Sequence, residues 1–250
     1  MTEPVLRIEG LTKRFGGLTA VNGVDFVMPG GELHAIIGPN GAGKTTLFNL
    51  ISGLLSADAG RIVFGGRDIT GERPHRISRL GIARTLQVKS VFNGLSVYDN
   101  VWIAAQTRRG FLHPVRPAHS YGDTDAKVRD LLAQTELEGH AKELAGNLSY
   151  GDVALLEIAI ALATEPRLLL LDEPVAGMSP SETARATARI RDLARRVDVI
   201  LIEHDMEVVF SIADRVTVMH QGAILAAGRP DEIRRDRRVQ DAYLGEGEDE

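Results

Sequence analysis

The sequence predicts an α/β protein with a mostly parallel β-sheet core, an N-terminal antiparallel β subdomain and a helical subdomain. Strand-like apolar runs such as 32–38 and 167–174 are followed by segments of helical periodicity, which favours parallel strands joined by helices. The first third alternates apolar and polar residues and breaks at Gly and Pro-Gly, as antiparallel strands do. From about 71 to 147 the apolar density drops and helical patches are present, so the helical subdomain is expected there.

The composition is typical of a globular protein, and the sequence contains no cysteine. Of the 250 residues, 44% are hydrophobic and 25% charged, which suits a soluble domain with a real core. The net charge of −5 argues against a surface built to wrap nucleic acid, and the lack of cysteine excludes disulfides and thiolate metal sites. No apolar run approaches the roughly 18–20 residues of a membrane span, and the N-terminus does not read as a secretory signal.

The elements of the first third are expected in a fixed order. Strands are predicted over 5–15, 21–28 and 32–38, a helix over 44–55, and a further strand pair or strand and turn over 60–70. The helix is predicted because Leu47, Leu50, Ile51 and Leu54 recur at helical spacing. The third strand opens directly into a glycine-rich loop that leads into this helix.

The last third repeats the alternation of strands and helices. Strands are predicted over 167–174 and 197–205, helices over 153–163, 182–196 and 206–214, and a hairpin over 215–228. The hairpin is expected to turn at Gln221 and Gly222. Ligands of open parallel sheets bind at the carboxyl ends of the strands, so the residues at these ends are candidates for chemistry.

Residues 38–45 fit the phosphate-loop pattern G-x-x-x-x-G-K-[ST], and they stand between an expected strand and an expected helix, as the pattern requires. Backbone amides from 40 to 46 can converge on phosphate oxygens, and the first helical turn adds free N–H groups. Lys44 supplies a mobile charge for the outer phosphates, and the Thr45 hydroxyl can ligate Mg²⁺. The loop therefore predicts a nucleoside triphosphate as ligand.

Two adjacent carboxylates follow the four leucines of 168–171. Asp172 stands at the carboxyl end of this strand, where it can reach Mg²⁺ directly or through water. Glu173 comes next and can orient or deprotonate the attacking water. The pattern also fits a strand that simply runs out into solvent, but the preceding phosphate loop favours the catalytic interpretation.

Two further motifs carry both a structural and a functional interpretation. Ser149 and Asp152 in LSYGD fit a capping box for the helix that follows. The glycine inside this cap also leaves an open helix N-terminus, which is an anion site. His204 stands at the end of another buried strand, and a lone histidine there is more often structural than catalytic.

These motifs resemble, in the same order, those of the ATP-binding subunits of ABC transporters, and the resemblance covers nearly the whole chain. GPNGAGKTT resembles the phosphate loop, LSYGD the signature, LLLLDEP the second nucleotide motif and AGMSP the D-loop. Gln87 in ARTLQVKSVF resembles the Q-loop glutamine, and His204 resembles the switch histidine. Phe15 stands where the family stacks an aromatic ring on adenine.

The finer match is to importers of branched-chain amino acids. LTKRFGGLTAVNGVDF, EPVAGMSP and IEHDMEVVFSIADRV are similar to their ATPase subunits, and most similar to the longer of the two in that system. The irregular stretch from about 107 to 125 resembles an insertion that these subunits carry. Importers of amides and urea have close sequences and stay an alternative.

The resemblance implies an ATPase that closes as a dimer around ATP and Mg²⁺. It assigns nucleotide binding to Phe15, Gly38, Pro39, Asn40, Gly41, Ala42, Gly43, Lys44, Thr45 and Thr46, and to Ser149, Tyr150 and Gly151 acting on the other copy's nucleotide. It assigns catalysis to Glu173, His204 and Gln87, and metal binding to Thr45, Gln87 and Asp172.

The resemblance also implies partners and a place of action. The subunit would pair with itself or with another ABC ATPase subunit, and it would bind transmembrane permease subunits at the cytoplasmic face of the inner (plasma) membrane. The segment after Gln87 would lie against a permease. An extracytoplasmic solute-binding protein would deliver the amino acid, and no nucleic acid would take part.

A single ABC ATPase domain is expected over 1–250. The nucleotide-binding core with its antiparallel part would take 1–86 and 165–250, the helical signature subdomain about 87–164, and an acidic tail 245–250. Such a tail is expected to be solvated.

Some positions depart from the family's pattern and keep other functions open. Val153, Ala154 and Leu155 follow the signature where polar or basic residues are common. Ser179 stands at a D-loop position often held by Asp or Asn, and Phe15 replaces the commoner tyrosine. A partner subunit with poor hydrolysis is therefore one alternative. A soluble ABC ATPase of translation or DNA repair is another, although this chain has one cassette and no heptads.

Overall fold

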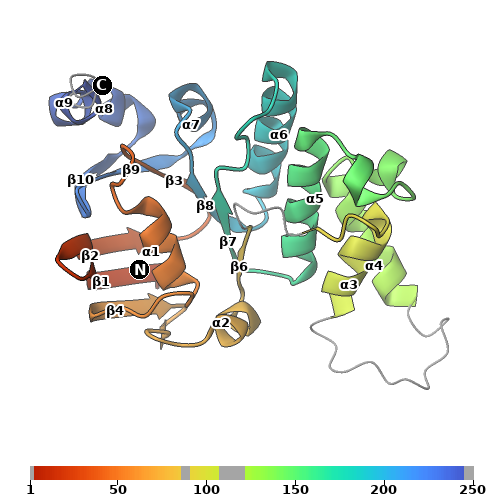
Figure 1. Ribbon diagram of the computed structural model, residues 1–250, viewed down its shortest axis with the longest axis horizontal. Helices are drawn as coiled ribbons and strands as arrows, with labels where there is room; N and C mark the ends of the chain where they lie inside the picture. Colours follow the sequence, from red (N-terminus) through yellow and green to blue (C-terminus); the bar gives the residue numbers. More distant parts are fainter. Residues whose placement is uncertain (1–2, 86–90, 107–121, 245–250) are drawn as a thin grey trace.

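The computed structural model describes residues 3–85, 91–106 and 122–244, and it contains two β-sheets flanked by helices (Figure 1). The first sheet comprises β1 (Leu6–Phe15), β2 (Leu18–Met28), β4 (Ala59–Phe64) and β5 (Arg67–Asp68). The second comprises β3 (Leu33–Ile37), β6 (Ile82–Arg84), β7 (Leu168–Asp172), β8 (Asp198–Ile202), β9 (Arg215–His220) and β10 (Ala223–Gly228). The α-helices are α1 (Lys44–Ile51), α2 (Pro74–Leu80), α3 (Val97–Gln106), α4 (Gly122–Gln134), α5 (Tyr150–Ala163), α6 (Pro180–Leu193), α7 (Met206–Ile212), α8 (Pro230–Arg235) and α9 (Arg237–Leu244).

The second sheet confirms the predicted, mostly parallel core. Its strand order is β10-β9-β3-β8-β7-β6, and its neighbouring strands run parallel except for the β9–β10 hairpin. Ile202 of β8 pairs with Ile36 of β3 on one side and with Asp172 of β7 on the other. Because parallel strands end at one edge, the loop after β3 and the residues after β7 and β8 leave the sheet together.

The first sheet confirms the predicted antiparallel N-terminal part. Its order is β2-β1-β4-β5, and β1 pairs antiparallel with both β2 and β4. Leu6 and Ile8 of β1 are buried in one core cluster with Leu47 and Phe48 of α1. The antiparallel sheet therefore covers α1, the helix that follows the glycine-rich loop, and fixes it against the parallel sheet.

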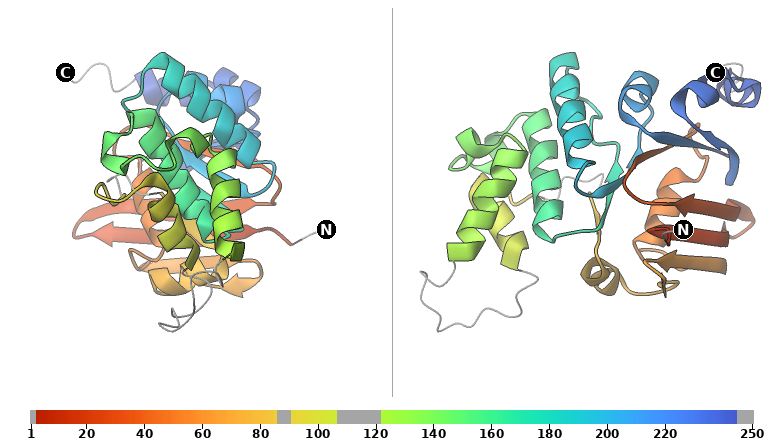
Figure 2. Two further views of the ribbon diagram at one scale, coloured as in Figure 1. Left: turned by 90° about the vertical axis from the view of Figure 1, so that its right-hand side faces the viewer. Right: turned by 180° about the vertical axis from the view of Figure 1, so that it is seen from behind.

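Helices α3, α4 and α5 pack together beside the parallel sheet, and α5 lies between α6 and the other two (Figures 1 and 2). Val101, Val128 and Leu156 are buried in their shared core. Most of the residues of the stretch from about 107 to 125 lie outside the described part of the chain. Within the described part, no helix is both long and apolar enough to span a bilayer.

The apolar start of α5 has a packing explanation. Val153 is 6% exposed and Leu155 is 1% exposed, because α5 is enclosed by helices on two sides. Burial of such side chains favours folding by about 25 cal/mol for each Å² removed from water. These positions therefore serve the helix packing, and the exposed Ser149 and Tyr150 stand just before them.

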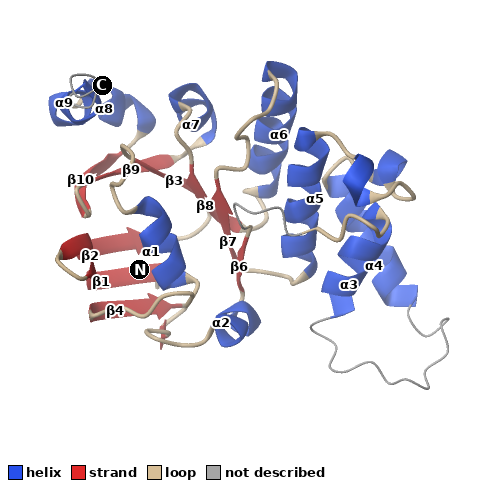
Figure 3. Ribbon diagram, in the orientation of Figure 1, coloured by secondary structure: helices blue, strands red, loops and turns tan. Residues whose placement is uncertain are grey.

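Three local features differ from the sequence expectations. α1 ends at Ile51 rather than continuing to residue 55, because Gly53 adopts a left-handed φ of +73°, and Leu54 is consequently half exposed. β6 is a short strand that the sequence analysis did not predict, and it extends the parallel sheet beside β7. The C-terminal helices α8 and α9 were also not predicted, and both are visible next to β10 (Figure 3).

Candidate nucleotide-binding and hydrolysis site

The phosphate loop joins β3 to α1 and depends on glycine at two crowded positions. Gly38 has a φ of +149° and Gly43 a φ of +99°. A Cβ atom at Gly38 would lie 2.1 Å from the Met219 carbonyl oxygen, and one at Gly43 would lie 2.3 Å from the Ala20 carbonyl oxygen. The loop therefore approaches β9 and β2 so closely that neither position accepts a side chain.

Gly43→Ala is expected to lower the free energy of unfolding by about 3 kcal/mol, because it adds a backbone clash to a strained φ. Gly41→Ala is the matched control. Gly41 also has a positive φ, but nothing lies within 4 Å of its added Cβ, so a loss of about 1 kcal/mol is expected. Urea unfolding followed by circular dichroism measures both values. Equal losses would contradict the close packing of the loop.

Lys44 begins α1 and folds back over the loop. Its Nζ donates hydrogen bonds to the carbonyl oxygens of Gly38 at 2.5 Å and Pro39 at 2.8 Å. Among the described residues, no side chain caps the start of α1, so the amides of its first turn can bind an anion. Thr45 and Thr46 stand in this turn, the first exposed and the second half-buried.

Asp172 ends β7 with a fully buried side chain. Its Oδ2 accepts a hydrogen bond from Nη2 of Arg84 at 2.8 Å, whereas its Oδ1 is buried without a hydrogen-bond partner among the described residues. Burial raises the pKa of the Asp172 carboxyl, and the Arg84 guanidinium acts in the opposite direction. A buried carboxylate oxygen left unpaired in the described chain suits a cation ligand, so the site fits Mg²⁺.

Glu173 follows in an unusual backbone conformation. Its φ is +50°, a region that residues with side chains seldom adopt. Its amide donates to the Ile202 carbonyl oxygen at 2.9 Å, which holds the turn at the carboxyl end of the sheet. Strained backbone of this kind is concentrated at functional sites. The half-buried carboxylate therefore stands on a turn that the sheet itself fixes.

A second glutamate, which is fully buried, connects this turn to His204. The Glu203 side chain is fully buried and accepts hydrogen bonds from the amides of Val175 at 3.1 Å and His204 at 3.2 Å. Burial raises the pKa of the Glu203 carboxyl. The His204 side chain is 64% exposed. Sequence reasoning missed Glu203, although an acid at the end of an apolar strand was a usable signal.

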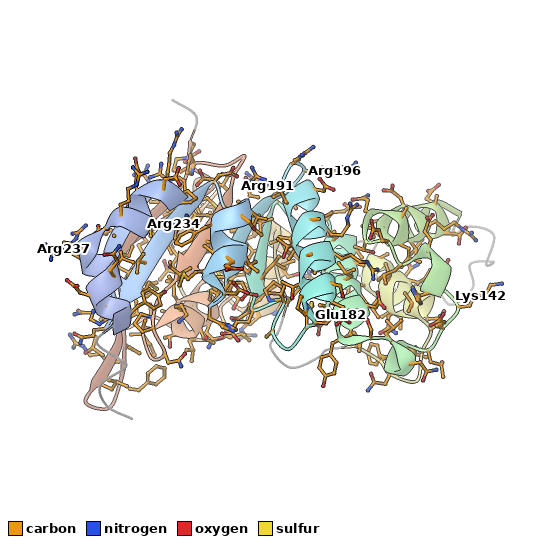
Figure 4. All side chains as sticks on the ribbon, turned by 90° about the horizontal axis from the view of Figure 1, so that it is seen from above. Lys142, Glu182, Arg191, Arg196, Arg234 and Arg237 are labelled. Atoms are coloured by element: carbon orange, nitrogen blue, oxygen red, sulfur yellow. The ribbon has the colours of Figure 1, made fainter. Side chains whose placement is uncertain are left out.

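The signature motif caps α5, as predicted, and also contacts α6. Ser149 is the N-cap: its Oγ accepts from the Asp152 amide at 3.2 Å and donates to Asp152 Oδ2 at 2.9 Å. The Gly151 amide donates to Glu182 Oε1 at 3.2 Å. Glu182 lies in the first turn of α6, next to α5, and forms a capping box with Ser179 (Figure 4). The N-terminus of α5 therefore already binds a carboxylate of its own chain.

The Glu182 contact predicts a pH dependence of stability. Hydrogen bonds from Ser179 and from the Gly151 amide lower the pKa of Glu182 from 4.5 to about 2. Because the folded pKa is depressed, the carboxylate stabilises the fold above about pH 4.5, and this contribution is lost as the pH falls towards 2. The urea midpoints of wild type and Glu182→Gln should therefore converge on acidification. A difference that stays constant from pH 7 to about pH 3 would contradict this prediction.

Three more of the predicted site residues lie at the surface or outside the described chain. Phe15 ends β1 and is 46% exposed, with Lys13 Nζ 5.6 Å from its ring centroid. Tyr150 is 62% exposed and lines a cavity of about 100 Å³ together with Glu173. Gln87 lies outside the described residues, so its predicted role stays a prediction.

A lysine folded over a glycine loop, with a buried aspartate ending a nearby parallel strand, defines a P-loop nucleoside triphosphatase. The family model for ABC transporters matches residues 21–176, and the model for branched-chain amino acid ATP-binding cassette transporters matches residues 223–249. The chain belongs to the ABC transporter family, as one of its ATP-binding proteins.

Curated relatives match nearly the whole chain. The high-affinity branched-chain amino acid transport ATP-binding protein BraF of Pseudomonas aeruginosa is 40% identical over 254 residues, which cover 98% of this chain and 100% of BraF. The corresponding protein LivG of Escherichia coli is 39% identical with the same coverage.

Solved structures share the fold. A nucleotide-free ATP-binding cassette from an ABC transporter superimposes with a TM-score of 0.84 at 31% identity, covering 96% of this chain and 99% of that one. A cassette in its ADP conformation gives a TM-score of 0.85 at 31% identity, covering 98% and 100%.

Proposed function

We propose that this chain is the subunit that binds and hydrolyses ATP to power an importer of branched-chain amino acids. The match of residues 223–249 to the branched-chain amino acid cassette model carries the proposal, together with full-length similarity to BraF and LivG. The described part of this segment belongs to the folded unit, because Ile233 of α8 and Val239 of α9 are buried against β9 and β10.

The phosphate loop binds the nucleotide in this proposal. Backbone amides from Asn40 to Thr46 and the Lys44 ammonium hold the phosphates, and Lys44 exchanges its carbonyl contacts for phosphate oxygens. The loop residues Gly38, Pro39, Gly41, Ala42 and Gly43 allow this close backbone approach. Phe15 offers its exposed ring face for stacking on adenine.

Thr45, Asp172 and Gln87 are proposed to hold Mg²⁺, which neutralises charge on the outer phosphates when it is bound. The buried, unpaired Oδ1 of Asp172 supports this assignment. Thr45 supports it by its exposed place in the first turn of α1. Gln87 is included on its position in the sequence alone.

Glu173 is proposed as the base that takes a proton from the attacking water. Its position directly after the proposed metal ligand Asp172 supports this role, since a general base must lie within hydrogen-bond reach of the water. His204 holds the water and the phosphate from the neighbouring strand end. The buried Glu203 fixes the His204 backbone, so the histidine side chain projects from an anchored position.

Two copies are proposed to close head to tail around two nucleotides. Ser149, Tyr150 and Gly151 of each copy then face the terminal phosphate on the other copy, where the α5 N-terminus stabilises negative charge. Ser149 and Tyr150 are exposed in the single chain, which supports an intermolecular role. The partner is a second copy or a related ATPase subunit.

The closing motion is proposed to act on transmembrane permease subunits at the cytoplasmic face of the inner membrane. An extracytoplasmic solute-binding protein supplies the amino acid to those subunits. The ATPase subunit couples the free energy of ATP binding and hydrolysis to transport, because the nucleotide shifts the equilibrium between its open and closed states.

Gene deletion in the source organism tests the proposed substrate. Uptake of radiolabelled leucine, isoleucine and valine should be lost, and a plasmid copy of wild type should restore it while Glu173→Gln should not. Loss of urea or amide uptake with intact leucine uptake would replace the proposal with amide or urea import. Intact uptake of all these solutes would favour a soluble ABC ATPase.

A further inference from the structure

Arg84 connects two motifs of the proposed nucleotide site through one guanidinium group. It ends β6, and its side chain is only 8% exposed. Nη2 donates to Asp172 Oδ2 at 2.8 Å, while Nη1 donates to Asn49 Oδ1 at 2.7 Å and to Ser52 Oγ at 3.2 Å. Asn49 lies in α1 and Ser52 follows it, so Arg84 joins the carboxylate of β7 to the phosphate-loop helix.

The geometry around Arg84 restricts the Asp172 carboxylate. The Phe48 ring covers the guanidinium, with its centroid 5.5 Å from Arg84 Cζ. The Arg84 guanidinium is thus held by an aromatic ring, two side-chain oxygens and the Asp172 carboxylate. With Oδ2 engaged, Oδ1 is the carboxylate oxygen left unpaired among the described residues.

We propose that Arg84 is a positioning residue for metal-bound ATP: it orients Asp172 so that Oδ1 is presented to the cation, and it fixes that oxygen relative to α1. This inference rests on the proposed function, since it requires a cation at Asp172. Arg84 touches Asp172, not the reacting atoms. Partners behind a metal ligand typically change metal affinity about 10- to 100-fold when they are removed.

The planar fork of arginine matters for this role. Its two ends reach Asp172 and the Asn49–Ser52 pair at the same time, whereas a lysine ammonium is a single point charge on a flexible stem. Arg84→Lys should therefore keep a buried cation but lose the fixed geometry. The competing explanation is an ion pair that supports only the fold, and removing one partner of such a pair destabilises the protein whatever ligand is present.

Titration of ATP into the purified full-length chain, in EDTA and in MgCl₂, separates the two explanations. The measured quantity is the ratio of the two dissociation constants, which is the gain in affinity due to Mg²⁺. Arg84→Met is expected to lower this gain about tenfold and to change the dissociation constant in EDTA by less than about threefold. Arg84→Lys should give a gain between those of wild type and Arg84→Met. Electron paramagnetic resonance measures Mn²⁺ binding in the presence of ATP. This binding should be strongest in wild type, weaker in Arg84→Lys and weakest in Arg84→Met.

Controls distinguish the possible failures. Arg167→Met removes another arginine that stacks on a phenylalanine, with its Cζ 5.2 Å from the Phe64 ring centroid, and should leave the gain unchanged. Asn49→Ala keeps the charge of Arg84 beside Asp172 but frees its other end, so it serves as a milder variant if Arg84→Met does not fold; it should lower the gain less.

The outcomes are separable. If wild type shows no gain from Mg²⁺, or if Asp172→Asn keeps it, the proposed metal site fails. If wild type and Asp172→Asn behave as expected but Arg84→Met and Asn49→Ala keep the full gain, the role of Arg84 is overturned. Equal losses of affinity in EDTA and in MgCl₂ would likewise overturn it in favour of a purely structural ion pair.

Discussion

Glu173→Gln is expected to lower the steady-state ATPase rate at least about a hundredfold while ATP still binds, because the amide keeps the size of the side chain but cannot accept a proton from water. ATP should then accumulate uncleaved, and the proposed closed dimer should persist. ATPase assays and size-exclusion chromatography with and without ATP measure the two effects.

Glu165→Gln provides a matched control for this substitution. Glu165 also has a positive φ, of +51°, and it lies before β7 in an ion pair with Lys127 at 2.6 Å. Its replacement should leave turnover unchanged. Near-normal hydrolysis by Glu173→Gln would remove Glu173 from the role of base. Hydrolysis already negligible in wild type would support a partner subunit with poor hydrolysis.

Lys44→Ala is expected to weaken ATP binding about 10- to 100-fold, since a hydrogen bond to a charged group contributes about 1.5–3 kcal/mol. The substitution removes the ammonium that otherwise lies over Gly38 and Pro39. Isothermal titration calorimetry with ATP measures the change directly.

Lys142→Ala is a suitable control, because Lys142 is exposed and lies beyond α5 at the far end of the molecule from β10 (Figure 4). It should bind ATP like wild type. Thermal unfolding of both variants checks that the fold is retained. An unchanged ATP affinity in folded Lys44→Ala would contradict the assignment of the phosphate loop.

The strands of the core could be predicted because a short run of consecutive apolar residues already indicates that a strand is buried. Runs such as 168–171 are apolar at every position, and strands buried on both faces of a parallel sheet need that composition. The glycine-rich loop was likewise readable, since its glycines and Lys44 all fall within residues 38–44. The hairpin at Gln221 and Gly222 was predicted correctly for the same reason.

Contacts between distant segments could not be predicted in this way. Arg84 and Asp172 are 88 positions apart, and only the pairing of β6 with β7 brings them together. Glu182 reads as an ordinary first-turn glutamate of its own helix, and nothing local indicates its bond to Gly151, 31 positions earlier. Such pairs depend on the fold, whereas the motifs depend on neighbours in the chain.

In the proposed closed dimer, the bond between the Gly151 amide and Glu182 would make association of two copies an exchange reaction. The incoming phosphate would displace a carboxylate that is already in place, so its net gain would be the difference between two anions rather than one full hydrogen bond. A ligand too short to reach this amide leaves the internal anion undisturbed. In the proposed dimer, this internal bond is therefore expected to oppose closure until a terminal phosphate competes for the Gly151 amide.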